Sequence, residues 1–113
     1  MHEMSLAEGV RTLIEREAER QRCAHVRVIE LEVGQLASVD VAALRFALDV
    51  VLRGSIADGS TIQISEPPGR AWCMMCGQNV PLAQRGAPCP QCGSYQLAVT
   101  DGEQMKVTGL VVD

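Results

Sequence analysis

The chain has 113 residues, of which 47% are hydrophobic, and it carries a formal net charge of −4 at pH 7. This length fits one compact unit with a small appended module, and the hydrophobic fraction is sufficient for a core. An acidic chain is a poor match for a nucleic-acid binder, no apolar run is long enough to span a membrane, and the charged N-terminal stretch does not resemble a signal peptide. We therefore expect a cytoplasmic protein that works without nucleic acid or membrane.

A first helix is predicted from residue 5 to about residue 22. Ser5 and Glu8 have the spacing of a capping box, in which each side chain bonds the backbone N–H of the other residue. Apolar residues then recur at helical spacing, opposite a face of Arg and Glu: Leu6, Val10, Leu13 and Ile14. This pattern predicts an amphipathic helix whose apolar face packs on the core.

A strand is predicted at 25–34, HVRVIELEVG, because apolar residues alternate along it with Ile29, Leu31 and Val33 on one face. The stretch LASVD then makes a turn, and either Ser38 or Asp40 caps a second helix. That helix runs through VAALRFALDVVLRG and ends near Gly54. Its apolar stripe consists of Val41, Leu44, Ala47, Leu48, Val51 and Leu52.

The chain changes character at 66–70, EPPGR, directly after a strand predicted at 61–65. Because proline cannot continue the hydrogen bonding of a strand, a module boundary is expected there. From Trp72 to about Tyr95 the sequence shows no helical or alternating pattern. A last strand at 104–112 is predicted to return to the first sheet. The fold class is therefore α+β, with the cysteine-rich segment as an insertion.

The cysteines carry the strongest chemical signal. CMMCG at 73–77 and CPQCG at 89–93 form the pattern C-x2-C-x12-C-x2-C. Under reducing conditions such pairs indicate metal ligands before disulfides. Four thiolates in two short pairs are typical of a closed, tetrahedral, structural zinc site, and the glycine after each pair provides the backbone freedom to aim amides at the sulfurs. The predicted zinc ligands are Cys73, Cys76, Cys89 and Cys92.

Other uses of this spacing are less well supported. A dithiol oxidoreductase usually has one C-x-x-C at a helix start and an exposed thiol of low pKa, and no Lys or His lies near these cysteines. An iron–sulfur centre also uses four cysteines, but less often in this doublet spacing. Arg85 is the only basic residue between the pairs, so the module is a poor platform for nucleic acid. Cys23, outside both pairs, is given no role.

The first three residues, Met-His-Glu, form a second candidate ligand set. The α-amine of Met1 and the backbone nitrogen and imidazole of His2 can bind one metal through fused chelate rings, which suits Ni²⁺ and Cu²⁺. Glu3 can add an oxygen ligand or accept a hydrogen bond from the imidazole. From these residues alone a solvated terminal histidine is the simpler interpretation, since chain ends are usually frayed. His25 is interpreted as a strand-edge residue that can still be recruited as a metal ligand.

The stretches MHEMSL, IELEVGQLASV and ALRFALDVV, followed by the two C-x-x-C pairs, occur in this order across essentially the whole chain. In this the chain resembles the HypA/HybF family of hydrogenase maturation nickel metallochaperones. The resemblance implies a nickel-binding α/β domain, 1–66 plus 99–113, with two helices packed on a small mixed β-sheet. It also implies a zinc-binding knuckle module at 67–98. His2 would be the essential nickel ligand and Glu3 would assist it.

The resemblance further implies that the chain is not an enzyme, and no nucleophile–base constellation or phosphate loop argues otherwise. Ni²⁺ would be a transient cargo and Zn²⁺ structural. The protein, a monomer or weak homodimer, would work with a HypB-type maturation GTPase. Together they would place nickel in the large subunit of [NiFe]-hydrogenase, and in some organisms serve urease maturation proteins as well.

One departure from the family concerns the nickel geometry. Some relatives supply an additional histidine from the zinc module, but no histidine occurs between residues 70 and 113 here. Any fourth ligand must come from the N-terminal backbone, Glu3, a partner or water. We also hypothesise that the zinc module is coupled to the nickel site through the linker at 66–70. The main alternative is a zinc-ribbon interaction protein that binds no second metal.

Overall fold

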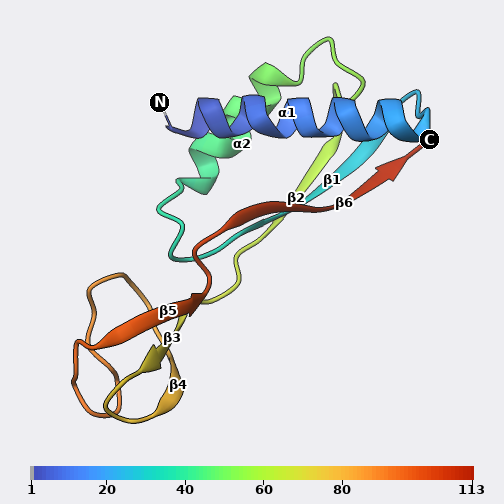
Figure 1. Ribbon diagram of the computed structural model, residues 1–113. Coiled ribbons are helices and arrows are strands. Elements are labelled where there is room, and N and C mark those ends of the chain that lie inside the picture. Colours follow the sequence, from blue (N-terminus) through green and yellow to red (C-terminus); the bar gives the residue numbers. More distant parts are fainter. Residues whose placement is uncertain (1) are drawn as a thin grey trace. The chain divides into compact units, whose positions relative to one another are not determined.

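The structure is a computed structural model, which describes residues 2–113. Its elements in chain order are α1 (His2–Gln21), β1 (Val26–Val33), α2 (Val41–Val51), β2 (Thr61–Ser65), β3 (Arg70–Cys73), β4 (Gln78–Pro81), β5 (Leu97–Asp101) and β6 (Met105–Val112) (Figure 1). The strands form two three-stranded sheets, ordered β2-β1-β6 and β4-β3-β5. Within these residues, no helix is long and apolar enough to cross a membrane.

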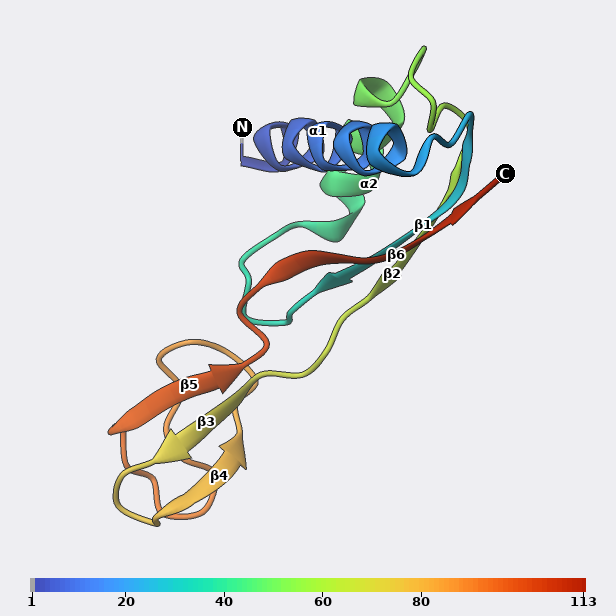
Figure 2. The ribbon, with the colours of Figure 1, turned by 45° about the vertical axis from the view of Figure 1, so that its right-hand side comes forward.

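The sheet β2-β1-β6 is mixed. Figures 1 and 2 show β1 and β2 running in the same direction, with α2 in the connection between them, while β6 runs the opposite way. A parallel pair needs such a crossover, because a tight turn cannot bring the chain back to the same end of the sheet. The place of β6 beside β1 confirms that the last strand returns to the first sheet. The α+β class is confirmed with it.

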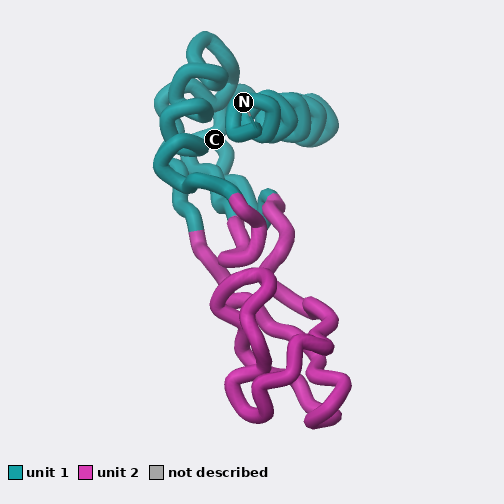
Figure 3. The backbone as a smooth tube through the Cα atoms, turned by 90° about the vertical axis from the view of Figure 1, so that its left-hand side faces the viewer, with its two compact units in different colours: residues 1–31, 39–64, 107–113 teal, residues 32–38, 65–106 magenta. Residues whose placement is uncertain are grey.

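The chain divides into two compact units, coloured separately in Figure 3. Unit 1 contains residues 1–31, 39–64 and 107–113, and unit 2 contains residues 32–38 and 65–106. Unit 2 therefore extends on both sides of 67–98, and it also takes in residues 32–38, from the end of β1 into the connection to α2.

Helix α1 begins earlier than the sequence predicts. It starts at His2, so Ser5 lies inside the helix and the predicted capping box of Ser5 and Glu8 does not mark its start. Glu3 in the first turn is favourable there, because a carboxylate complements the partial positive charge of a helix N-terminus. Leu13, predicted on the buried face, is 48% exposed. The buried face consists of Ala7, Val10, Ile14 and Ala18.

Helix α2 is capped by Asp40, one of the two predicted candidates. The Asp40 carboxylate accepts a hydrogen bond of 3.1 Å from the backbone N–H of Ala43. At the other end, the Arg11 guanidinium of α1 donates to the backbone carbonyl of Val51 at 2.7 Å, and a cation there complements the helix dipole. The two helices pack on each other. The buried residues of α2 and its end are Leu44, Ala47, Leu48 and Leu52.

Unit 2 contains three strands that the sequence did not predict. β3 is central and pairs antiparallel with both β4 and β5, so that Ala71 faces Val80 on one side and Val99 on the other. The strands have only four or five residues, too few for alternation to show. The core of the unit is small. One cluster consists of Leu36, Ala71 and Leu82, and a second of Cys73, Val80 and Cys89.

Three stretches of unit 2 meet backbone to backbone at its glycines. The N–H of Leu36 donates to the carbonyl of Gly102 at 2.7 Å, and the N–H of Gly34 donates to the carbonyl of Gln104 at 3.0 Å. A Cβ atom on Gly34 would overlap the backbone of Gly102, and one on Gly69 would overlap the carbonyl of Leu82. These close approaches require residues without side chains.

We predict that Gly34→Ala destabilises the protein by about 2 kcal/mol or more, because the added methyl group can only displace backbone. Gly9→Ala is the matched control: Gly9 is an exposed position inside α1, with nothing within 4 Å of an added Cβ atom. It should stabilise the helix by up to about 1 kcal/mol. Urea unfolding followed by the fluorescence of Trp72 in unit 2 and by helical circular dichroism tests both. Equal stability of Gly34→Ala and the native chain would contradict the close approach of Gly34 to the backbone of Gly102.

Candidate metal centre

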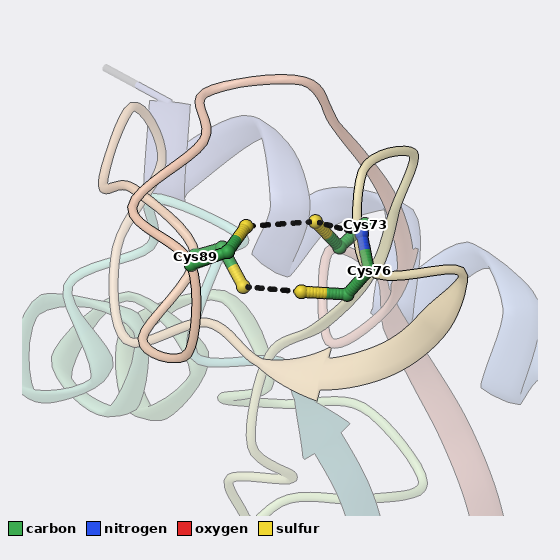
Figure 4. Close-up of side chains that lie close together, drawn as sticks. Cys73, Cys76 and Cys89 are labelled. Atoms are coloured by element: carbon green, nitrogen blue, oxygen red, sulfur yellow. Dashed lines mark hydrogen bonds between the residues drawn. The ribbon is translucent and has the colours of Figure 1, made fainter.

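The four paired cysteines lie together in unit 2. Cys73 is the last residue of β3, Cys76 follows in the turn before β4, and Cys89 and Cys92 lie in the loop between β4 and β5. Their Sγ atoms all lie within 4.8 Å of one another. Figure 4 shows the side chains of Cys73 and Cys76 pointing across to Cys89. The fold thus brings together the four residues that the spacing singles out.

The sulfur spacing fits a tetrahedral ion. The Sγ atoms of Cys73 and Cys92 are 3.6 Å apart, and those of Cys76 and Cys89 are 3.8 Å apart. A disulfide has sulfurs about 2.05 Å apart, and these thiols are free. A tetrahedral zinc ion with Zn–S bonds of about 2.3 Å holds its ligands about 3.8 Å apart. The cluster therefore has the dimensions of a closed four-sulfur site.

Each cysteine pair lies on the same kind of turn, which we call a knuckle (residues 73–77 and 89–93). The N–H of Gly77 donates to the carbonyl of Cys73 at 2.9 Å, and the N–H of Gly93 donates to the carbonyl of Cys89 at 2.9 Å. Both glycines have positive φ, 66° and 77°. Residues with a Cβ atom rarely adopt this conformation, so the glycine after each pair provides the backbone freedom that the sequence predicts.

Backbone amides point at the sulfur of the first cysteine in each knuckle. The N–H of Cys76 lies 3.3 Å from Cys73 Sγ, and the N–H of Gln91 lies 3.4 Å from Cys89 Sγ. The pKa of Cys89 is lowered to about 7 by the backbone N–H of Cys92 and then by that of Gln91. The pKa of Cys76 is raised to about 12, first by its hydrogen bond with the Cys92 thiol. In a crowded group of thiols, one thiol ionises readily while its neighbours stay protonated, because like charges repel. A bound divalent cation removes this repulsion and allows all four to ionise.

The N-terminal candidates lie in the first turn of α1. His2 is exposed, whereas Glu3 is half-buried and its carboxylate accepts a hydrogen bond of 3.2 Å from the backbone N–H of Asp40. Met1 lies outside the described residues. Among residues 2–113, the four cysteines are the only group of three or more potential ligands that converge, so no further His, Cys, Asp or Glu cluster gathers around His2. Sequence reasoning missed the link from Glu3 to Asp40, since a contact between distant residues leaves no local pattern.

The remaining two candidates lie elsewhere in unit 1. His25 directly precedes β1, and its Nδ1 lies 3.4 Å from a carboxylate oxygen of Asp113. Hydrogen bonds from His25 and then Arg27 lower the pKa of Asp113. Cys23 is half-buried and lines a groove between α1 and β6. The structure does not bring either residue into the cysteine cluster.

A small α+β domain joined to a closed four-cysteine module defines a metal-binding protein whose sulfur site leaves no open position for a substrate. Comparison with known proteins agrees: residues 1–112 match the family model described as "Hydrogenase/urease nickel incorporation, metallochaperone, hypA". The chain belongs to this family of nickel metallochaperones, which act in hydrogenase maturation.

Individual relatives support the assignment. Hydrogenase maturation factor HypA of Azotobacter chroococcum mcd 1 is 50% identical over 113 residues, 100% of both chains. The protein of the same name from Azoarcus sp. (strain BH72) is 52% identical over 112 residues, 99% of this chain and 98% of the relative. Among solved structures, the Ni metallochaperone HypA from Helicobacter pylori aligns with a TM-score of 0.73 at 19% identity, covering 97% of this chain and 96% of that chain. That structural match supports the fold.

Replacing one ligand should abolish tight metal binding at the cluster. We expect Cys89→Ser to lose the bound metal, because a neutral hydroxyl replaces a buried thiolate. Cys23→Ser is the control and should retain one equivalent. Elemental analysis of the purified variants by mass spectrometry measures both. Metal retained in Cys89→Ser, or lost in Cys23→Ser, would show that the cluster is not the site.

Proposed function

We propose that this chain holds one Zn²⁺ permanently at Cys73, Cys76, Cys89 and Cys92 and carries one Ni²⁺ at its N-terminus. With a HypB-type maturation GTPase it delivers the nickel to the large subunit of a [NiFe]-hydrogenase in the cytoplasm. The observation that carries the proposal is the family match over residues 1–112, together with a sulfur cluster of tetrahedral dimensions. Since the family description also names urease, urease maturation proteins are a second class of partner.

The zinc assignment rests on the chemistry of the donors. Four thiolates favour a soft or borderline ion, and tetrahedral sulfur sites are typical of zinc. The role is structural because all four positions are occupied by protein. Ion binding would contribute on the order of 10 kcal/mol to the folding of the module, which has only two small clusters of buried residues.

The nickel assignment is supported by the position of His2 at the start of a helix. The first N–H groups of an α-helix have no partner within the helix, so nickel can bind the deprotonated backbone nitrogen of His2 without breaking a helical hydrogen bond. The imidazole of His2 and the α-amine of Met1 would complete a set of nitrogen donors that suits a square-planar Ni²⁺ ion. Glu3 would assist from the next position.

Delivery requires a site that binds nickel and then yields it. His2 is exposed, so ligands of an acceptor protein can approach the metal while the first ligands are still bound. Nickel would then transfer through an intermediate in which ligands of both proteins coordinate it. Affinity alone cannot select nickel, because Cu²⁺ binds nitrogen donors more tightly. Selection would depend on metal supply and on recognition by the GTPase and the hydrogenase subunit.

A nickel titration of zinc-loaded protein with a native N-terminus tests the proposal. His2→Ala, and a variant extended by two residues before Met1, should each lose one equivalent of Ni²⁺ while keeping their zinc. His25→Ala is the matched control, because it removes the only other histidine, and it should bind as the native chain does. Isothermal titration calorimetry gives the stoichiometry. If all four proteins bind nickel alike, the zinc-ribbon interaction protein becomes the better account.

Two substitutions at Glu3 separate its possible contributions. Glu3→Gln keeps an oxygen that can accept the hydrogen bond from the Asp40 N–H, whereas Glu3→Ala removes it. We expect Glu3→Ala to weaken nickel binding more than Glu3→Gln, because the loss of this bond loosens the turn that holds His2. The same calorimetric titration measures both variants. Equal losses would instead assign the effect of Glu3 to its negative charge, as a direct ligand requires.

A further inference from the structure

The four cysteines of the cluster differ in their access to solvent. Cys73 and Cys89 are 0% and 2% exposed, Cys76 is half-buried and Cys92 is exposed. Cys92 also lines an open hollow on unit 2, whose other residues are Met75, Ser94, Tyr95 and Gln96. A small reagent in solution therefore reaches Cys92 before the other three residues.

Backbone hydrogen bonds also distinguish the two buried cysteines from the other two. The amide hydrogen bonds from Cys76 and Gln91 reach the first cysteine of each knuckle, Cys73 and Cys89. An N–H bond withdraws electron density from a thiolate and weakens it as a nucleophile. The second cysteine of each knuckle is thus the more reactive one. Of these two, Cys92 is the more exposed.

We propose that Cys92 is the site at which hydroperoxides oxidise the module, and that Cys73 is its disulfide partner. This rests on the proposed zinc at the four cysteines. In the first step the Cys92 thiolate attacks one oxygen of the peroxide. An S–O bond forms, the O–O bond breaks and hydroxide leaves. The sulfur is oxidised by two electrons to the sulfenic acid while the peroxide is reduced.

The second step uses the contact between the sulfur atoms of Cys73 and Cys92. Cys73 Sγ lies 3.6 Å from Cys92 Sγ and attacks it. The S–S bond forms, the S–O bond breaks, and the hydroxide that leaves takes up a proton to become water. Two thiolates are thereby consumed for each peroxide. Only Cys76 and Cys89 remain as ligands, so the zinc ion is released.

The disulfide joins the end of β3 to the loop of the second knuckle and does not close within either pair. Both knuckles therefore stay connected after the ion has left. A thiol reductant should regenerate all four ligands, and zinc should bind again. The chemistry makes the module a reversible peroxide-sensitive site and not merely a support for the fold.

The test uses zinc-loaded protein with Cys23→Ser, which removes the one thiol outside the cluster. Its zinc content is first measured by elemental analysis. Hydrogen peroxide below one equivalent is then added with dimedone, which traps sulfenic acids, and the labelled cysteine is identified by mass spectrometry. A parallel sample without dimedone is mapped for disulfides while a chromophoric chelator reports free zinc.

We expect dimedone chiefly on Cys92. In the sample without dimedone we expect a disulfide from Cys73 to Cys92 and zinc release in step with that disulfide, and dithiothreitol with added zinc should reverse both. Met75→Leu, which removes the thioether beside Cys92, should leave the pattern unchanged. Labelling of Cys76 ahead of Cys92, a disulfide within one knuckle, or zinc retained after the disulfide forms would overturn this inference. Each of these results would leave the proposed zinc role in place. A protein without zinc before peroxide is added would overturn the proposed zinc role and this inference with it.

Discussion

The convergence of four sulfur atoms on one point is the constraint on which unit 2 depends. Thiols placed 3.6 to 3.8 Å apart cannot all ionise unaided, because each new negative charge raises the cost of the next. Cys73 and Cys89 are also two of the three buried residues in one of the two small core clusters of the unit. The proposed cation at the centre would balance this charge and tie the two knuckles together. The short strands of the unit and the close backbone approaches at its glycines are then arranged around this centre.

The chain passes between unit 2 and unit 1 in the connection between β1 and α2 as well as near the proline-containing linker. Leu36 lies in a core cluster of unit 2, and its carbonyl accepts a 3.1 Å hydrogen bond from the Arg85 guanidinium of the same unit. Four residues later Asp40 caps α2, and its own N–H donates to Glu3. The segment from Leu36 to Asp40 is therefore anchored at both ends. It offers a covalent route between the proposed zinc and nickel sites in addition to the predicted linker at 66–70.

The sequence was informative wherever a pattern is local. The C-x2-C doublets predict the cysteine cluster, because two residues between cysteines suit a knuckle. The helices follow from apolar residues at helical spacing, and the strands at 25–34 and 104–112 from apolar residues that share one face. What it could not predict depends on distant contacts. Leu36 reads as part of a turn, yet it is 2% exposed in the core of unit 2. α1 extends back to His2, and Glu3 in that first turn accepts a hydrogen bond from Asp40, which follows β1 in the chain.

The two proposed metal sites meet opposite physical requirements, and the chain separates them accordingly. A structural ion needs all its positions filled by protein, in buried surroundings, and the knuckles provide this with thiolates that hold borderline ions tightly. A cargo ion needs positions that another protein can take over, and an exposed helix start provides unpaired amide nitrogens beside one imidazole. Since thiolates would also bind nickel well, the cluster must be saturated before the cargo arrives. In the proposed function, permanent occupation of the sulfur site by zinc would therefore keep the incoming nickel at the N-terminus, from which it can be transferred.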